Sequence, residues 1–178
     1  MWGKILIFAE SYNRYQSMRF LGTIEAKIDS KGRAFLPASF RKELQGGGET
    51  TLVMRKDVFQ PCLVLYPESV WNRQMDALRS RLNRWDATHQ SIFRQFVAEA
   101  EAVTLDANGR FLISKRMLNV AGIGQSVRFV GMDDTVEIWS GAAAGRGFMA
   151  QEDFGKAIQG IMAEAGDGRR CAADGAAD

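Results

Sequence analysis

The sequence has few of the residues that build metal and redox sites. It contains one histidine, His89, and two cysteines, Cys62 and Cys171, which lie far apart in the chain. A zinc site needs about four such ligands at short spacings, and a histidine-based triad needs a nucleophile beside its base. Neither set is present, and so few cysteines are typical of a reducing compartment. We therefore expect no metal, no cofactor, no small-molecule substrate and no enzymatic activity.

Long apolar runs are also missing. A helix that spans a membrane needs about 20 apolar residues. The run Ile5-Leu6-Ile7-Phe8 is too short even for the core of a secretory signal. The pattern described below starts at Met18, so we interpret residues 1–17 as a flexible extension or as the result of a start codon placed too far upstream. These absences favour a cytoplasmic protein without a membrane partner.

What the chain does contain is one short motif, present twice. Residues 29–33 are Asp-Ser-Lys-Gly-Arg and residues 106–110 are Asp-Ala-Asn-Gly-Arg, at an offset of 77 positions. Apolar residues flank both copies at matching positions: Ile28 and Leu105 before the motif, and Phe35, Leu36, Leu112 and Ile113 after it. The matching flanks indicate a duplicated unit, in which each copy is a basic β-hairpin followed by a short helix.

Each copy has the chemistry of a tight turn. Glycine adopts the left-handed conformation that closes such turns at little cost, and an aspartate at the first position accepts hydrogen bonds from nearby backbone N–H groups. We therefore assign loop-orienting roles to Asp29, Gly32, Asp106 and Gly109. One copy alone would also fit an ordinary hairpin whose arginine is merely solvated. The second copy, with its matching flanks, favours a functional role.

Positive charge is concentrated on the repeated unit. The net charge of the chain is only +2, but residues 26–42 carry five bases and one acid, and residues 103–117 carry three bases and one acid. Residues 150–178 carry six acids and three bases. An anionic partner would bind where positive charge gathers, which is at the two motifs.

Hydrophobic periodicity predicts a similar order of elements around both motifs. We expect strands at residues 20–28, 33–36, 51–55, 62–66, 103–105, 111–113, 127–130 and 136–139. We expect helices at residues 38–44, from Pro67, after a cap at Asp86, at 115–120 after a cap at Ser114, and at 149–163. The chain then divides into an extension (1–17), a first repeat (18–66), a linking helical hairpin (67–100), a second repeat (101–140), a C-terminal helix (141–165) and a disordered tail (166–178).

Both helices of the linking hairpin have an apolar stripe. The stripes consist of Trp71, Met75, Leu78 and Leu82 in the first helix, and of Ile92, Phe93, Phe96, Val97 and Ala100 in the second. We interpret both stripes as core or as a subunit interface rather than as a cofactor site.

These features together resemble the MraZ family of bacterial transcriptional regulators, within the AbrB-like swapped-hairpin superfamily. The resemblance covers about residues 18–140 and depends on four segments, which are residues 29–37, 62–67, 106–113 and 136–139. It implies an α+β fold, namely a tandem-duplicated AbrB-like swapped-hairpin β-barrel with short helices and a central helical hairpin.

The resemblance also implies a function. Proteins of this family bind DNA in a sequence-specific manner at short G-rich repeats, repress their own operon in the division and cell wall gene cluster, and assemble as rings. Their Asp-x-x-x-Arg loops contact DNA, which corresponds to Asp29, Arg33, Asp106 and Arg110 in this chain. The expected partners are therefore double-stranded promoter DNA and further copies of the chain, and the expected location is the nucleoid.

The residues themselves also support DNA binding. Arginine forms the commonest specific major-groove contact, to O6 and N7 of guanine, and a two-stranded ribbon fits that groove. Arg33 and Arg110 are therefore the candidate base-contacting residues. Asn108 is also a candidate DNA-binding residue, although it offers less charge than Lys31, which has the same position in the first motif. Phosphate contacts are expected from the other basic residues near the motifs, which are Lys27, Lys31, Arg41, Lys42, Lys115 and Arg116. Each lysine taken alone is equally compatible with a solvated surface charge.

The alternative from another class is a protein-binding module. Swapped-hairpin domains also occur in antitoxins, in which a C-terminal segment wraps a toxin, and the acidic residues 149–178 could have that role. An antitoxin is typically short with one hairpin, whereas this chain has two copies and a helical hairpin between them.

Overall fold

The computed structural model describes residues 18–143, 145 and 147–170. The chain forms two compact units, Met1–Ala144 and Gly145–Asp178. The first unit combines a mostly antiparallel sheet with short helices, which confirms the predicted α+β class. The predicted N-terminal extension, 1–17, lies outside the described residues.

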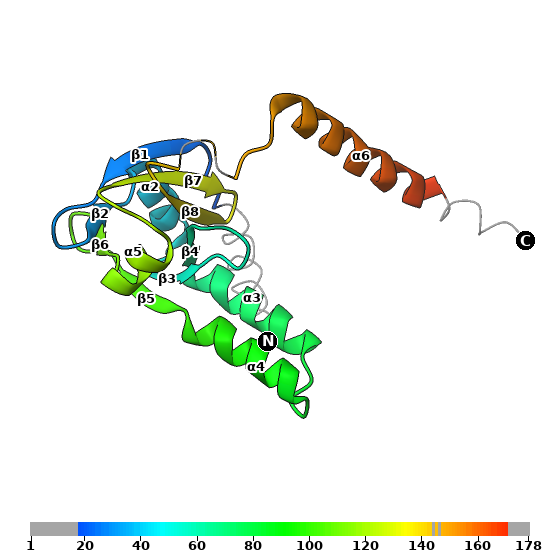
Figure 1. Ribbon diagram of the computed structural model, residues 1–178, viewed down its shortest axis with the longest axis horizontal. Coiled ribbons are helices and arrows are strands. Elements are labelled where there is room, and N and C mark those ends of the chain that lie inside the picture. Colours follow the sequence, from blue (N-terminus) through cyan, green and yellow to red (C-terminus); the bar gives the residue numbers. More distant parts are fainter. Residues whose placement is uncertain (1–17, 144, 146, 171–178) are drawn as a thin grey trace, which may run out of the picture. The chain divides into compact units, whose positions relative to one another are not determined.

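The strands of the first unit form one large and one small sheet (Figure 1). The strands are β1 (Thr23–Lys27), β2 (Arg33–Phe35), β3 (Thr51–Lys56), β4 (Leu63–Pro67), β5 (Glu101–Thr104), β6 (Arg110–Leu112), β7 (Ser126–Met132) and β8 (Thr135–Ser140). The large sheet has the order β1-β7-β8-β4-β3-β5, and the small sheet pairs β2 with β6. Among the described residues, the ladders leave β1 and β5 as edges, so they do not close the predicted barrel.

The strands of each repeat pair with strands of the other repeat. Strand β1 pairs with β7, β5 pairs with β3, and β2 pairs with β6, all antiparallel. The hairpin expected around the first motif is short: the N–H of Asp29 donates to the carbonyl of Arg33 at 2.9 Å, and one antiparallel bridge joins Ile28 to Ala34. Strand β2 has three residues and can form few hydrogen bonds with β1. It pairs with β6 of the other repeat, and this pair buries Ala34 and Phe111.

Both repeats contribute to one hydrophobic core. Its buried side chains include Phe20, Leu36, Phe40, Leu52 and Met54 from the first repeat and Phe111, Ile113, Met117, Val127 and Phe129 from the second. The rings of Phe111 and Phe129 meet edge to face, with centroids 6.3 Å apart. Because a single core joins both halves, neither repeat is expected to fold alone.

Helices α4 and α5 begin at the residues that the sequence signals indicate. The side chain of Asp86 accepts a hydrogen bond from the N–H of His89 at the start of α4 (Ala87–Ala98), and Ser114 Oγ accepts one from the N–H of Met117 at the start of α5 (Lys115–Val120), as predicted. Helix α2 (Ala38–Gly47) runs three residues past its predicted end. The helix ends at Gly48, whose left-handed φ of 74° forms the C-cap. Gly47 packs against Met18, where a Cβ atom would collide.

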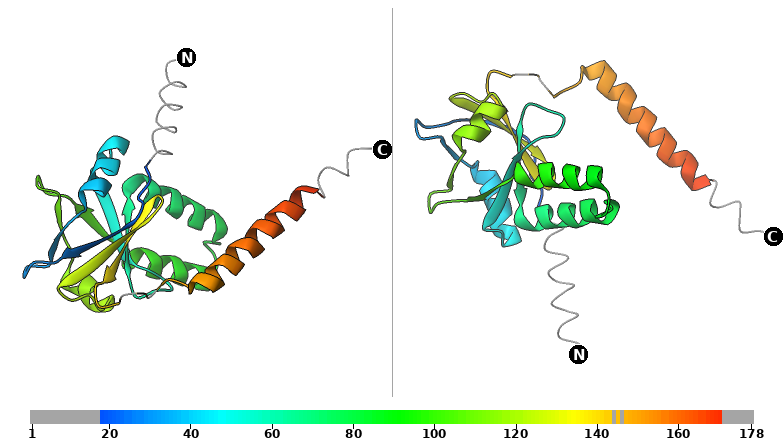
Figure 2. Two further views of the ribbon diagram at one scale, coloured as in Figure 1. Left: turned by 90° about the horizontal axis from the view of Figure 1, so that it is seen from above. Right: turned by 60° about the horizontal axis from the view of Figure 1, so that its bottom comes forward.

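The linking hairpin consists of α3 (Glu68–Arg81) and α4, which lie side by side in Figures 1 and 2. Trp71 of α3 packs on Tyr66 of β4 and stacks on Phe96 of α4, with ring centroids 5.5 and 5.8 Å away. The buried guanidinium of Arg55 lies over the ring of Phe96, with its Cζ 3.9 Å from the centroid. The predicted stripe of α4 is only partly covered within the chain, because Ile92 and Val97 are exposed.

The second unit contains helix α6 (Gln151–Arg170). It continues past 165, the predicted end of the C-terminal helix, so residues 166–170 of the predicted disordered tail are helical. Backbone hydrogen bonding alone can extend a helix beyond its apolar stripe. Residues 171–178 of that tail lie outside the described residues. Of the helices described, none combines the length and the apolar character that a membrane span requires.

Candidate nucleic-acid interface

The two motifs form turns with the same backbone geometry. In the first turn (29–33) the N–H of Gly32 donates to the carbonyl of Asp29 at 3.0 Å, and in the second turn (106–110) the N–H of Gly109 donates to that of Asp106 at 2.8 Å. Both glycines have positive φ, 83° and 78°. Glycine adopts this conformation without the steric cost of a Cβ atom, which explains the Gly in both motifs.

Each aspartate holds both its turn and its arginine. Oδ1 of Asp29 accepts hydrogen bonds from the backbone N–H groups of Lys31 and Arg33, both at 2.9 Å. Oδ2 of Asp29 accepts from Nε of Arg33 at 2.7 Å. Asp106 makes the same set of bonds in the second turn, with Asn108 and Arg110 as the backbone donors and Arg110 Nε at 2.7 Å. The loop-orienting role predicted for the aspartates therefore has a direct geometric basis.

These bonds also change the acidity of the two carboxyls. The backbone N–H of Arg33, followed by its guanidinium, holds the pKa of Asp29 below its ordinary value of 3.8. The backbone N–H of Arg110 is the largest cause of the lowered pKa of Asp106. Hydrogen bonds to a carboxylate favour its charged form, so both aspartates are anions at neutral pH and keep their arginines in place.

The arginines share one face of a two-stranded ribbon, which we define as β2 and β6. Arg33 lies opposite Leu112, and Phe35 lies opposite Arg110. Residues that face each other across an antiparallel pair point to the same side, so all four occupy one face. Ala34 and its partner Phe111 point to the other side and are buried in the core.

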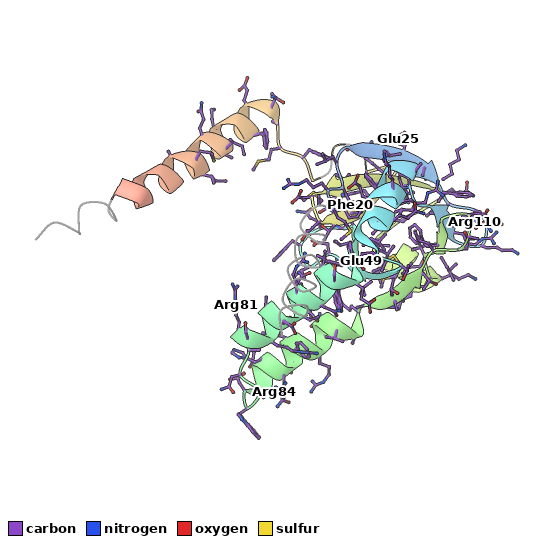
Figure 3. The ribbon with its side chains drawn as sticks, turned by 180° about the vertical axis from the view of Figure 1, so that it is seen from behind. Phe20, Glu25, Glu49, Arg81, Arg84 and Arg110 are labelled. Atoms are coloured by element: carbon purple, nitrogen blue, oxygen red, sulfur yellow. The ribbon has the colours of Figure 1, made fainter. Side chains whose placement is uncertain are left out.

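This outer face is accessible. Internal ion pairs hold both arginines, yet their side chains remain 36% exposed at Arg33 and 30% exposed at Arg110. In Figures 1 and 2 both turns lie at the end of the first unit opposite the α3–α4 hairpin, and Figure 3 shows Arg110 projecting at that end. The guanidinium groups can therefore meet a partner as large as a duplex without unfolding the chain.

The predicted phosphate-contacting residues fall into two groups. Lys27, Lys31, Lys42 and Lys115 are exposed, and they form no salt bridge with any described residue. Lys31 lies in the first turn itself. Arg41 and Arg116 instead have internal partners that the sequence did not predict.

Arg116 is held by the start of β5. Its Nη2 lies 2.8 Å from Oε1 of Glu101, and its Nε donates to the same oxygen at 3.0 Å. Arg41 reaches the other repeat, where its Nη1 donates to the backbone carbonyl of Asn108 at 2.8 Å. Asn108 is exposed in the second turn, at the position that Lys31 occupies in the first.

Two apolar residues at the site were missed in the sequence. Phe35 and Leu112 are 55% and 57% exposed on the outer face of the ribbon, and the guanidinium of Arg110 lies 5.7 Å from the ring of Phe35. The signal was available, because Arg-x-Phe and Arg-x-Leu place both residues on one side of a strand. The site is thus a face on which each arginine has an apolar neighbour.

A known protein family matches most of the chain. The family described as "MraZ protein, putative antitoxin-like" matches residues 19–94 and 96–143, which include both turns and the ribbon. The chain belongs to the MraZ family. This confirms the family predicted from the two motifs and their flanks.

Individual relatives carry the same family name. The protein named transcriptional regulator MraZ from Phocaeicola vulgatus is 61% identical over 145 residues, 82% of this chain and 94% of the relative. That from Bacteroides fragilis is 58% identical over 147 residues, 83% of this chain and 93% of the relative. That from Christiangramia forsetii is 36% identical over 122 residues, 68% and 78% of the two chains. All three relatives are named as transcriptional regulators.

Proposed function

We propose that this protein is a sequence-specific DNA-binding regulator that inserts the β2–β6 ribbon into the major groove. The observation that supports this most is the pair of guanidinium groups, Arg33 and Arg110, fixed by aspartates on one exposed ribbon face. Two-stranded ribbons fit the major groove, and arginine recognises guanine there through two hydrogen bonds.

The internal ion pairs are compatible with this contact. Asp29 occupies the Nε side of Arg33 and approaches Nη2 at 2.7 Å, so Nη1 and the outer N–H of Nη2 stay available for guanine O6 and N7. A side chain that is already oriented loses less conformational entropy on binding than a free one. Asp29 and Asp106 act on DNA only through their arginines, because phosphates would repel the carboxylates.

Phosphate contacts come from the exposed lysines. Lys31 extends from the first turn, Lys27 lies at the end of β1, and Lys115 starts α5. Such contacts position a protein on the duplex without selecting a sequence, and they make the affinity depend on salt. Asn108 offers a neutral hydrogen-bonding side chain in the second turn.

One ribbon makes few contacts, so we propose that the protein acts as a homo-oligomer, a ring, on repeated promoter boxes. Several ribbons on direct repeats gain avidity through effective concentration without any new contact. In this view the chain binds G-rich repeats upstream of its own operon, represses it, and is found with the nucleoid. We propose that the strand exchange between repeats is the tandem swapped-hairpin arrangement of this superfamily.

A second candidate is an antitoxin-like module that binds a protein. The observation that favours it is α6, whose apolar residues are exposed within the described chain: Phe154, Ile158, Ile161 and Met162. This hypothesis gives no role to Arg33 and Arg110, the two aspartate-bound arginines of the ribbon, so we rank it second.

The proposal is tested with the full chain and the DNA directly upstream of its own gene. We expect a retarded complex that a scrambled duplex of the same composition fails to compete away, and light scattering should give a mass several times the 19.8 kDa of one chain. Equal competition by the scrambled duplex would overturn sequence-specific binding. A stoichiometric protein partner from lysate, without any DNA complex, would favour the antitoxin-like reading.

A further inference from the structure

The two turns are supported differently by the helices that follow the ribbon. Positions 41 and 118 correspond at the offset of 77, and so do 32 and 109. Arg41 of α2 lies against Gly109, whereas Leu118 of α5 lies near Gly32, with its Cδ1 3.7 Å from where a Cβ would be. Each helix therefore supports the turn of the other repeat, one with a cation and the other with an apolar side chain.

The ribbon brings these helices to the turns. The N–H of Leu36, just after β2, donates to the carbonyl of Gly109 at 3.0 Å, and the N–H of Ile113, just after β6, donates to that of Gly32 at 2.9 Å. These reciprocal bonds place the start of each helix beside the opposite turn. Among the described residues, a side chain of the opposite helix bonds only to the second turn, where Arg41 Nη1 donates to the carbonyl of Asn108.

We infer that Arg41 is the positioning residue of the second turn, where its guanidinium takes the place that the apolar side chain of Leu118 has at the first turn. Its guanidinium fixes the Asn108–Gly109 peptide, because the carbonyl of that peptide accepts from Arg41 while its N–H donates to Asp106. Gly109 has no side chain, and a Cβ there would collide with Arg41, so the glycine also makes room for the guanidinium.

Arg41 is half-buried, and the burial of its Nε supports a positioning role over that of a free surface charge. Its Nε is buried and has no hydrogen-bond partner among the described atoms, a cost that a freely solvated surface arginine avoids. The first turn has the reverse arrangement. Its cation, Lys31, lies in the turn itself, at the position that Asn108 has in the second turn, and the helix residue beside it, Leu118, is apolar. The cation at the first turn is therefore exposed, whereas the cation at the second turn is bonded to the backbone of that turn.

This inference has a test that does not depend on DNA. Arg41→Leu copies the residue that the chain itself has at position 118, so the fold should be retained. Exchange of the Gly109 and Leu36 amide hydrogens should speed up about tenfold, which corresponds to about 1.4 kcal/mol, whereas Gly32 and Ile113 should be unaffected. The matched variant Lys42→Leu removes the same charge from an exposed neighbour and should leave all four rates unchanged. Equal rates in the parent and Arg41→Leu would overturn the inference.

A second test measures DNA binding in a double-mutant cycle, and it rests on the proposed function. Arg41→Leu should weaken operator binding about tenfold in the parent and in Arg33→Ala, but less than about twofold in Arg110→Ala, because its effect passes through the second turn. An equal loss in all three backgrounds would make Arg41 an independent DNA contact and overturn the inference. If the parent binds no DNA, the proposed function fails, and the exchange rates alone decide the role of Arg41.

Discussion

Oδ2 of Asp29 lies 2.7 Å from both Nε and Nη2 of Arg33, and the Asp106–Arg110 pair repeats the Nε contact at 2.7 Å. Each carboxylate also holds the backbone of its turn. The turn and the guanidinium are therefore oriented by one group, so a change at the aspartate should affect both folding and binding.

Acid should remove part of the stability that these aspartates provide. Folding lowers the pKa values of Asp29 and Asp106 below 3.8, so the unfolded chain binds more protons as the pH falls toward that value. Their contribution is complete above the unfolded-state pKa and is lost as the pH falls through the folded-state values. The double variant Asp29→Asn/Asp106→Asn should show a flatter fall in the free energy of unfolding below about pH 5, measured by urea titration at several pH values. A variant curve as steep as that of the parent would contradict this linkage.

The two turn glycines should differ in their tolerance of a methyl group. Either alanine substitution has a left-handed backbone cost of about 1–2 kcal/mol. At Gly32 the new Cβ would also lie 2.8 Å from the backbone carbonyl of Ile113, whereas at Gly109 it meets the end of the Arg41 side chain. Displacing that side chain breaks its hydrogen bond to the carbonyl of Asn108 but shifts no backbone. Urea unfolding should therefore show a larger loss of stability for Gly32→Ala than for Gly109→Ala. The reverse order would show that Arg41 resists displacement more strongly than the backbone.

Lys31 should affect affinity without affecting sequence preference. Lys31→Ala removes an exposed charge of the first turn, and each lost phosphate contact lowers the slope of log K against log salt by about 0.9. Binding to operator and to scrambled DNA should weaken by the same factor across a salt series. A changed preference for the operator, with an unchanged slope of log K against log salt, would instead show that Lys31 contacts a DNA base.

Cys62 should be unreactive in the folded protein. Burial raises the pKa of its thiol to about 12, with the carboxylate of Glu137 adding to the shift. The thiolate is the reactive form, so alkylation by iodoacetamide should follow unfolding in urea. The measurement uses Cys171→Ser to leave one thiol. Labelling in native buffer at the rate of a free cysteine would contradict the burial.

Much of the fold could be predicted because its signals are local. The turns follow from Asp and Gly at fixed spacing, and the caps at Asp86 and Ser114 follow from the residues that can accept hydrogen bonds from a helix start. The pairing of β2 with β6 could not be predicted in this way, because partner choice depends on which surfaces are buried when both repeats fold together.

At the site, sequence spacing identified the arginines but not their surroundings. The exposed Phe35 was visible in principle from strand alternation, once Ala34 was known to face the core. The contact between Arg41 and Asn108 spans 67 positions and depends on the exchange of strands, so no local pattern indicated it.

The central claim, that the β2–β6 ribbon binds DNA, is tested most directly by replacing Arg33 and Arg110 one at a time. We expect Arg33→Ala and Arg110→Ala each to weaken binding to the upstream DNA by about 1–3 kcal/mol, about 5- to 150-fold, and to reduce discrimination against a scrambled duplex. Arg81→Ala, an equal loss of charge at the far end of α3 in Figure 3, should bind like the parent. If both ribbon variants kept the affinity and the preference of the parent in fluorescence anisotropy, the ribbon would not be the DNA-binding surface.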